Sequence, residues 1–168
     1  MRTLALWIAQ GFGIGRIRVA PGTFGSALGL LWFGLLLHTG NLWLYLLGTV
    51  LGLVLSVWLS GIAEQILQKK DPSSVVIDEI AAIPVCFLGW VGKWWMGHHG
   101  LPSFSSFFSP KTWYWTLLIF ALFRIFDIAK PWPVRGSQAL SGGWGVTIDD
   151  FLAAIYVVVL SLAFFWLV

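Results

Sequence analysis

Residues 42–63 read LWLYLLGTVLGLVLSVWLSGIA and contain no charged side chain. A helix that crosses the hydrocarbon core of a bilayer needs about 20 mainly apolar residues, so this stretch is long enough to cross once. It ends at Glu64, where a polar run that includes Lys69 and Lys70 begins. Such a run after an apolar helix is typical of a loop. Residues 42–63 therefore predict a transmembrane helix.

The composition of the whole chain agrees with a membrane protein. Hydrophobic residues make up 58% of the chain and charged residues 10%, whereas soluble domains carry about 25% charged residues. Charge-free runs cover residues 19–63, which include 42–63, and residues 80–92, 112–123 and 151–168. We therefore expect an all-α, polytopic membrane helix bundle with about four to five membrane-embedded helices, built as a single domain over residues 1–168.

The remaining helices are expected at four places along the chain. Residues 26–37 are short for a straight crossing, so this helix could be broken, tilted or re-entrant. A third helix is expected at about 75–92 with a kink at Pro84, a fourth at 113–129 and a last one at 151–168. The stretch 130–148 is expected to be a loop, and residues 3–14 to form an interfacial helix.

Basic residues are distributed unevenly between the two sets of loops. If five segments each cross once, Lys93 and Lys111 lie on one side, and seven lie on the other: Arg16, Arg18, Lys69, Lys70, Arg124, Lys130 and Arg135. Loops rich in Lys and Arg usually stay in the cytoplasm, so we expect the side with seven basic residues to be cytoplasmic. The net charge of +3 is small, and the basic residues lie at the ends of the expected helices. This placement favours contact with anionic lipid headgroups over nucleic acid.

Acidic residues gather beside the ends of apolar segments, in loops expected to share the cytoplasmic face. All seven follow this rule: Glu64, Asp71, Asp78, Glu79, Asp127, Asp149 and Asp150. Carboxylates next to a membrane are costly and usually functional. The acidic residues are therefore the first candidates for a site.

The stretch APGTFGS at 20–26 is a glycine-containing turn that opens an apolar helix. Its backbone amides and the helix N-terminus could receive a phosphate through Gly22, Thr23, Gly25 and Ser26. The alternative is a Pro-Gly turn with a Ser or Thr cap.

The stretch VVIDE at 75–79 places Asp78 and Glu79 side by side at a helix start. Two such carboxylates could ligate Mg²⁺, which prefers a small number of carboxylates together with water and phosphate oxygens. The alternative is that the acids only complement the helix dipole.

The stretch FRIFDIAKPWPVR at 123–135 carries Arg124, Asp127 and Lys130 at three-residue spacing along one helix side. Arg and Lys could bind the phosphate while Asp127 reaches a metal. A structural salt bridge with a snorkelling Lys is the alternative.

The stretch GGWGVTIDD at 142–150 is interpreted as a flexible loop that ends in Asp149 and Asp150 at a helix start. Thr147 and Asp150 also have the spacing of a capping box, which would make them purely structural.

Taken together, these stretches describe a metal site for a phosphate ester at the level of the lipid headgroups. Metal-assisted hydrolysis of a phosphomonoester is the chemistry that such a site favours. The alternative from another class is a small cation transporter or channel that uses the acidic cluster. Against it, the polar groups concentrate on one face rather than along a pathway.

The four stretches, in this order and spacing over nearly the whole chain, resemble the phosphatidylglycerophosphatase A family. The resemblance implies a bacterial inner-membrane, Mg²⁺-dependent phosphatase with a cytoplasmic site. Its implied reaction removes the terminal phosphate from phosphatidylglycerophosphate and gives phosphatidylglycerol, a step of phospholipid biosynthesis. The implied partner is therefore a phospholipid in the bilayer.

Carried over residue by residue, the resemblance implies catalytic and metal-binding acids, a basic pair and a phosphate-binding turn. The acids are Asp78, Glu79, Asp127, Asp149 and Asp150, the basic pair is Arg124 and Lys130, and the turn is Gly22, Thr23, Gly25 and Ser26. Glu64 and Asp71 are further candidates for metal ligation. Two departures are Ala82 and Ala154, where the family often has glycine, and these concern helix packing more than chemistry.

Overall fold

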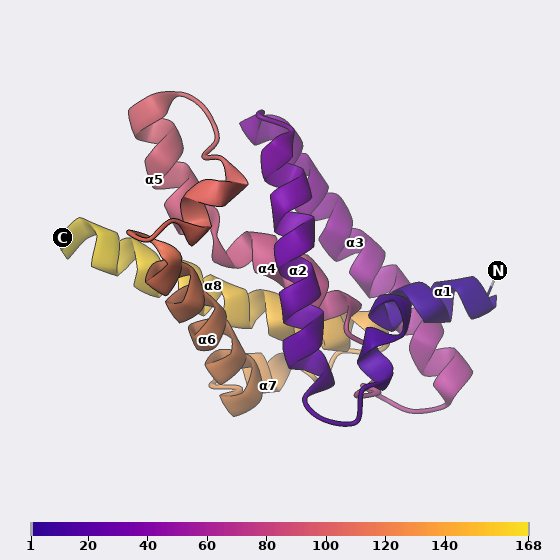
Figure 1. The fold of residues 1–168 in the computed structure, drawn as a ribbon. Coiled ribbons are helices and arrows are strands. Elements are labelled where there is room, and N and C mark those ends of the chain that lie inside the picture. The colour runs from indigo at the N-terminus through magenta and orange to yellow at the C-terminus, as the bar shows by residue number, and fades with distance from the viewer. Residues whose placement is uncertain (1, 168) are drawn as a thin grey trace.

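The computed structural model describes residues 2–167, and over this range the chain forms helices and no strand, which confirms the all-α prediction (Figure 1). In chain order, the elements are α1 (Arg2–Ala9), η1 (Gly11–Arg16), α2 (Pro21–His38), α3 (Leu42–Leu67), α4 (Ile77–Cys86), α5 (Leu88–His98), η2 (Phe104–Phe108), α6 (Trp113–Ala129), α7 (Val134–Ser137) and α8 (Gly143–Leu167).

Within the described residues, three helical segments are long and apolar enough to cross a membrane. They are Leu42–Leu67, Ile77–His98 and Gly143–Phe164. A helix is thus present at the predicted residues 42–63, and it extends to Leu67. Its outward side chains are apolar and exposed, as at Trp43 (75%) and Val54 (59%), which suits contact with lipid. Four to five membrane-embedded helices were expected, and three of the described helical segments are long and apolar enough to cross.

α2 is continuous from Pro21 to His38, which excludes the broken helix that was one of the alternatives for residues 26–37. The interruption falls in the third segment, where a kink at Pro84 was expected. There α4 ends at Cys86 and α5 continues in a new direction (Figure 1). Pro84 has no backbone N–H and so leaves the carbonyl four residues earlier without its helical donor. The hydroxyl of Tyr45, on α3, donates a hydrogen bond to the Pro84 carbonyl at 2.6 Å and ties the break to α3.

The last helix begins earlier than the sequence suggested. α8 starts at Gly143, and α7 covers Val134–Ser137, so the loop expected at 130–148 was wrong over residues 134–137 and 143–148. Gly143 lies so close to α3 that an added Cβ would be 1.8 Å from the Val57 carbonyl oxygen. The glycines that indicated a flexible loop instead allow two helices to cross closely. Because Thr147 lies within the helix and its hydroxyl is paired with that of Ser56 at 2.8 Å, it does not cap the helix.

The N-terminal helix is also shorter than expected. α1 ends at Ala9 and a 3₁₀ turn follows, whereas a helix over 3–14 was predicted. The fourth helix has the predicted bounds, 113–129.

The short helix α4 lies in the middle of the bundle and contacts α2, α3, α6 and α8. The core next to the junction of α4 and α5 is aromatic: the ring of Phe33 stacks on that of Phe87 with centroids 4.4 Å apart and meets the edge of Phe107 at 4.9 Å. All three side chains are fully buried. Phe87 directly follows α4, so this packing holds the end of α4 that lies opposite Asp78 and Glu79. The contacts of α4 with α2, α6 and α8 hold the helix itself in place.

Candidate active site

Three buried carboxylates form the centre of the site. Asp78 and Glu79 come from the first turn of α4, and Asp150 comes from α8. One oxygen from each lies within 4.8 Å of the others. The three residues are 7%, 9% and 3% exposed, so solvent screens their charges weakly. The fold therefore concentrates three acidic side chains in a buried site, where an unneutralised charge costs the most free energy.

Each of these acids has an oxygen without a hydrogen-bond donor. The unpartnered atoms are Oδ1 of Asp78, Oε2 of Glu79 and Oδ2 of Asp150. A buried carboxylate either takes up a proton, pairs with a cation or coordinates a metal. Oxygen atoms of carboxylates are the ligands that Mg²⁺ prefers, usually one or two of them with water and phosphate. The donor set at Asp78, Glu79 and Asp150 therefore fits a hard divalent cation.

The two other acids near the centre are paired with basic side chains. Asp127 Oδ2 lies 2.8 Å from Nη1 of Arg124, one turn earlier on α6. Asp149 Oδ2 accepts a hydrogen bond from Lys130 Nζ. The five acids that the sequence grouped as one set of metal ligands thus divide into three that each keep an oxygen without a partner and two that are paired with a basic side chain.

Lys130 stands at the C-terminal end of α6, in the left-handed conformation with φ 44°. Burial alone would lower the pKa of Lys130, but the hydrogen bond and the negative charge of Asp149 outweigh burial and raise it. Lys130 is therefore a permanent cation beside the acidic centre.

Arg124 links three parts of the site. Its Nη1 donates to the Ser26 hydroxyl at 3.2 Å, pairs with Asp127 and lies 3.7 Å from Oε1 of Glu79. Its Nε is buried and has no acceptor. A buried guanidinium N–H without a partner is unusual and suits the oxygen of a phosphate. An unsatisfied donor therefore belongs to the same site as the unsatisfied carboxylates.

The turn at 20–26 approaches the site differently from the cradle that the sequence suggested. Gly22, Gly25 and Gly29 lie along the side of α2 that faces α4. An added Cβ on these glycines would be 2.2 Å from Glu79 Oε1, 2.7 Å from Val76 Cβ and 2.7 Å from Ile83 Cγ1, respectively. These glycines allow the two helices to pack closely.

Ser26 is fully buried within this contact, where its hydroxyl donates to the Gly22 carbonyl at 2.8 Å. The amide of Thr23 is bonded to the Ala20 carbonyl at 3.0 Å. Of the four turn residues, Gly22 and Ser26 thus lie against Arg124, whereas Gly25 packs on Val76.

The structure leaves Glu64 and Asp71 outside the central group. Glu64 Oε1 accepts a hydrogen bond from the backbone amide of Asp71 at 2.8 Å in the loop between α3 and α4. The exposed Asp71 is joined to Asp149 through Gln138, whose Nε2 lies 3.3 Å from Asp71 and 3.2 Å from Asp149. Gln138 was missed in the sequence because a single polar residue in a loop carries no recognisable pattern.

Comparison with known proteins identifies the family of the chain. The profile of the family described as phosphatidylglycerophosphatase A matches residues 7–165. The chain belongs to the phosphatidylglycerophosphatase A family. A phosphatidylglycerophosphatase A of Haemophilus influenzae is 35% identical over 162 residues, which cover 95% of this chain and 88% of that protein. The phosphatidylglycerophosphatase A of Escherichia coli is 33% identical over 151 residues, or 88% of this chain and 76% of that protein.

A third relative carries a different name. A putative phosphatidylinositol-3-phosphatase of Bacteroides thetaiotaomicron is 34% identical over 170 residues, covering 98% of this chain and 96% of that protein. No solved structure matches the chain. Membership of the phosphatidylglycerophosphatase A family confirms the resemblance seen in the sequence and makes the chain a phosphatase.

Proposed function

We propose that the protein removes the terminal phosphate of phosphatidylglycerophosphate with the help of Mg²⁺ and leaves phosphatidylglycerol and inorganic phosphate. The observation that carries the proposal is the set of unsatisfied buried groups: three carboxylate oxygens that lack a cation and one guanidinium N–H that lacks an anion. A metal ion and a phosphate bound together satisfy both. The relatives named phosphatidylglycerophosphatase A support this choice of substrate.

Asp78, Glu79 and Asp150 would hold the metal through the oxygens that have no other partner. A bound Mg²⁺ polarises phosphoryl oxygens and lowers the pKa of a coordinated water. Asp127 and Asp149 act on the basic residues: each holds a cation in place next to the centre and balances its charge.

Arg124 and Lys130 would bind the oxygens of the terminal phosphate. Arg124 presents Nε, while Ser26 and Asp127 fix its other end. Lys130 adds a point charge from the end of α6. Donors preorganised in a water-poor site stabilise the charge that develops in the transition state, and removing one such donor typically costs about 10²–10³ in rate.

The reaction exchanges one P–O bond for another. An oxygen of water forms a bond to phosphorus, and the bond between phosphorus and the terminal glycerol oxygen breaks. That oxygen takes up a proton and becomes the free hydroxyl of phosphatidylglycerol, while phosphate leaves.

The site lies at one end of the bundle, and we place that end at the cytoplasmic surface of a bacterial inner membrane, where the enzyme would serve phosphatidylglycerol and cardiolipin synthesis. The excess of Lys and Arg in the loops on that side supports this orientation. α2 and α6 would complete four to five membrane-embedded helices, since their 18 and 17 residues span about 26 Å, close to the hydrocarbon thickness of about 30 Å.

Two alternatives are separable from this proposal. The relative named a putative phosphatidylinositol-3-phosphatase makes an inositol headgroup the second candidate substrate. A cation transporter would use the same acids, but membership of a phosphatase family favours hydrolysis.

The test is phosphate release by the full-length protein in detergent from phosphatidylglycerophosphate and from phosphatidylinositol 3-phosphate, with Mg²⁺ or with excess chelator. Asp78→Asn removes a proposed ligand. Glu64→Gln is the matched control, because Glu64 lies outside the centre and Gln can still accept the bond from the Asp71 amide.

We expect release from phosphatidylglycerophosphate that needs Mg²⁺, is lost in Asp78→Asn and persists in Glu64→Gln. Release that continues in chelator, or in folded Asp78→Asn, contradicts the metal assignment. Preference for the inositol lipid would replace the substrate but keep the site.

A further inference from the structure

The helices α6 and α8 run antiparallel and touch along a seam that starts at the acidic centre. At one end, Lys130 is bonded to Asp149. In the middle, the ring of Phe126 stacks on that of Tyr156 with centroids 5.1 Å apart. At the other end, the ring of Trp115 lies 4.7 Å from that of Phe164. The same faces of the two helices therefore carry polar groups at one end and aromatic groups at the other.

An apolar groove of about 190 Å³ opens along the far part of this seam. Its walls are Trp115, Leu118 and Leu122 from α6 and Leu160, Ser161 and Phe164 from α8. Leu118 and Leu160 are each 43% exposed, so the groove is open to the bilayer. At a rise of 1.5 Å per residue, Leu122 and Leu118 lie about 12 and about 18 Å along the helix from Lys130.

We propose that the groove between α6 and α8 seats one acyl chain of the lipid whose terminal phosphate lies at the acidic centre. This inference rests on the proposed function. The interval between Lys130 and Leu122 accommodates the two glycerol units and the phosphodiester that separate the terminal phosphate from the acyl chains. The chain then continues along the seam toward Trp115 and Phe164, away from the headgroup.

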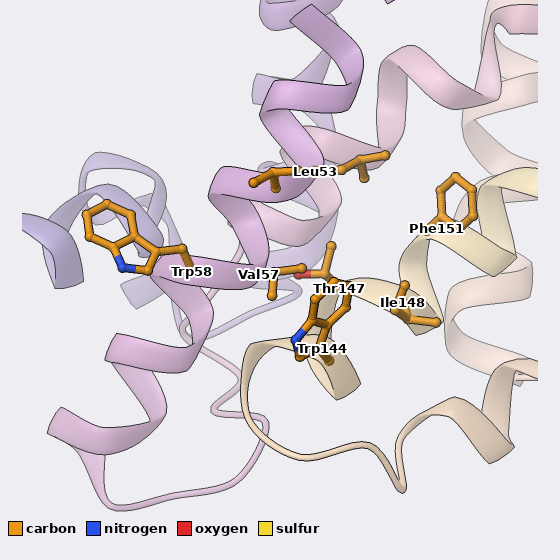
Figure 2. Close-up of a pocket in the computed structure, with 8 residues that line it drawn as sticks. Leu53, Val57, Trp58, Trp144, Thr147, Ile148 and Phe151 are labelled. Atoms are coloured by element: carbon orange, nitrogen blue, oxygen red, sulfur yellow. The ribbon is translucent and has the colours of Figure 1, made fainter. Parts of the chain in front are cut away.

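A second apolar groove is larger, but it lies in the wrong place to hold the acyl chain of a lipid whose phosphate is at the acidic centre. A groove of about 440 Å³ lies between α3 and α8, with Leu53 and Val57 on one wall and Ile148 and Phe151 on the other (Figure 2). On α8, Ile148 and Phe151 face α3, whereas Asp149 pairs with Lys130 at the end of α6. An acyl chain in the α3–α8 groove would therefore lie on a different side of α8 from the Lys130–Asp149 pair.

The groove acts by placing the lipid and adds little affinity. Lipid tails are as apolar as Leu side chains, so moving a chain from the bilayer into the groove gains little hydrophobic free energy. A chain held in the groove instead fixes the depth and direction of the headgroup. Misplacement of a reacting group by 1 Å can cost about 10²-fold in rate.

The first experiment fills the groove from either wall and compares two substrates in mixed micelles. Leu118→Trp and Leu160→Trp narrow the groove, and Val54→Trp places the same ring in the α3–α8 groove as a control. Dipalmitoyl phosphatidylglycerophosphate has chains long enough to run along the groove, whereas the chains of the dibutanoyl lipid end near its start at Leu122.

We expect both groove variants to lower kcat/KM about 10-fold for the dipalmitoyl substrate and less than about 2-fold for the dibutanoyl substrate. Val54→Trp should change neither. Equal losses on both substrates, no loss on either, or a chain-dependent loss in Val54→Trp would overturn the proposal.

A second measurement is independent of turnover and of whether the variants fold. Wild-type protein is irradiated with a phosphatidylglycerol that carries a diazirine midway along one acyl chain, and the labelled peptides are identified. Label on α6 and α8 supports the groove even if no lipid phosphate is hydrolysed, in which case the proposed function alone fails. Label concentrated on α3, with phosphatase activity intact, rejects the groove and keeps the function.

Discussion

Replacing Asp150 by Asn should stabilise the metal-free protein while destroying its activity. Two full charges 4.8 Å apart repel by about 3 kcal/mol at an effective dielectric constant of about 20, and Asp150 has both Asp78 and Glu79 within that distance. Asn keeps the shape and removes the charge. Allowing for imperfect hydrogen bonding of the new amide, we expect a net gain of about 1–3 kcal/mol in unfolding free energy.

Asp149→Asn is the matched opposite, on the neighbouring residue of the same helix. Asp149 carries the negative charge of a pair with Lys130, so its loss leaves a partly buried ammonium without its carboxylate. Breaking a fully buried pair costs about 3–5 kcal/mol. Because the Lys130 side chain is 24% exposed, we expect a smaller loss of about 1–3 kcal/mol.

The assay is thermal unfolding of the purified protein in detergent, first with excess chelator and then with Mg²⁺. In chelator, Asp150→Asn should melt above the wild type and Asp149→Asn below it, by about 2–4 °C for each kcal/mol. Adding Mg²⁺ should raise the midpoint of the wild type, because a ligand that binds the folded state stabilises it. The same addition should raise Asp150→Asn much less.

If both variants shift in the same direction in chelator, the division into unpaired and paired acids is wrong. If Mg²⁺ stabilises Asp150→Asn as much as the wild type, Asp150 is not a ligand.

Two further predictions test the basic residue and the glycines. Lys130→Met should lower kcat/KM by about 10²-fold, because it removes a phosphate donor and leaves Asp149 unneutralised, and Lys130→Arg should restore part of the loss; equal activity in Met and Arg variants would argue against a charge role. Gly22→Ala should lower activity about 10-fold or more with little loss of stability, because its Cβ meets the end of the Glu79 side chain, whereas Gly29→Ala, which meets Ile83, should cost about 1–3 kcal/mol of stability and leave the kcat of folded protein intact. Steady-state kinetics and thermal melts of both pairs check these outcomes.

The parts of the fold that local sequence could predict are the long apolar helices. The helix at 42–63 and the helix at 113–129 were placed closely, because charge-free runs and their polar ends are local signals. The start of α8 was missed because glycines at 142–145 indicate flexibility when no neighbour is known. In the fold, Gly143 is required by contact with Val57 of α3.

By itself, the sequence determined that the chain has helices long and apolar enough to cross a membrane and which side chains are available for its chemistry, because hydropathy and residue type are properties of each segment alone. The tertiary structure decided how those side chains are used. It left one oxygen each of Asp78, Glu79 and Asp150 without a donor, and it paired Asp149 with Lys130. The reason is physical: whether a carboxylate is free to hold a metal depends on which cation packs within a few ångströms of it, and that neighbour comes from a distant part of the chain.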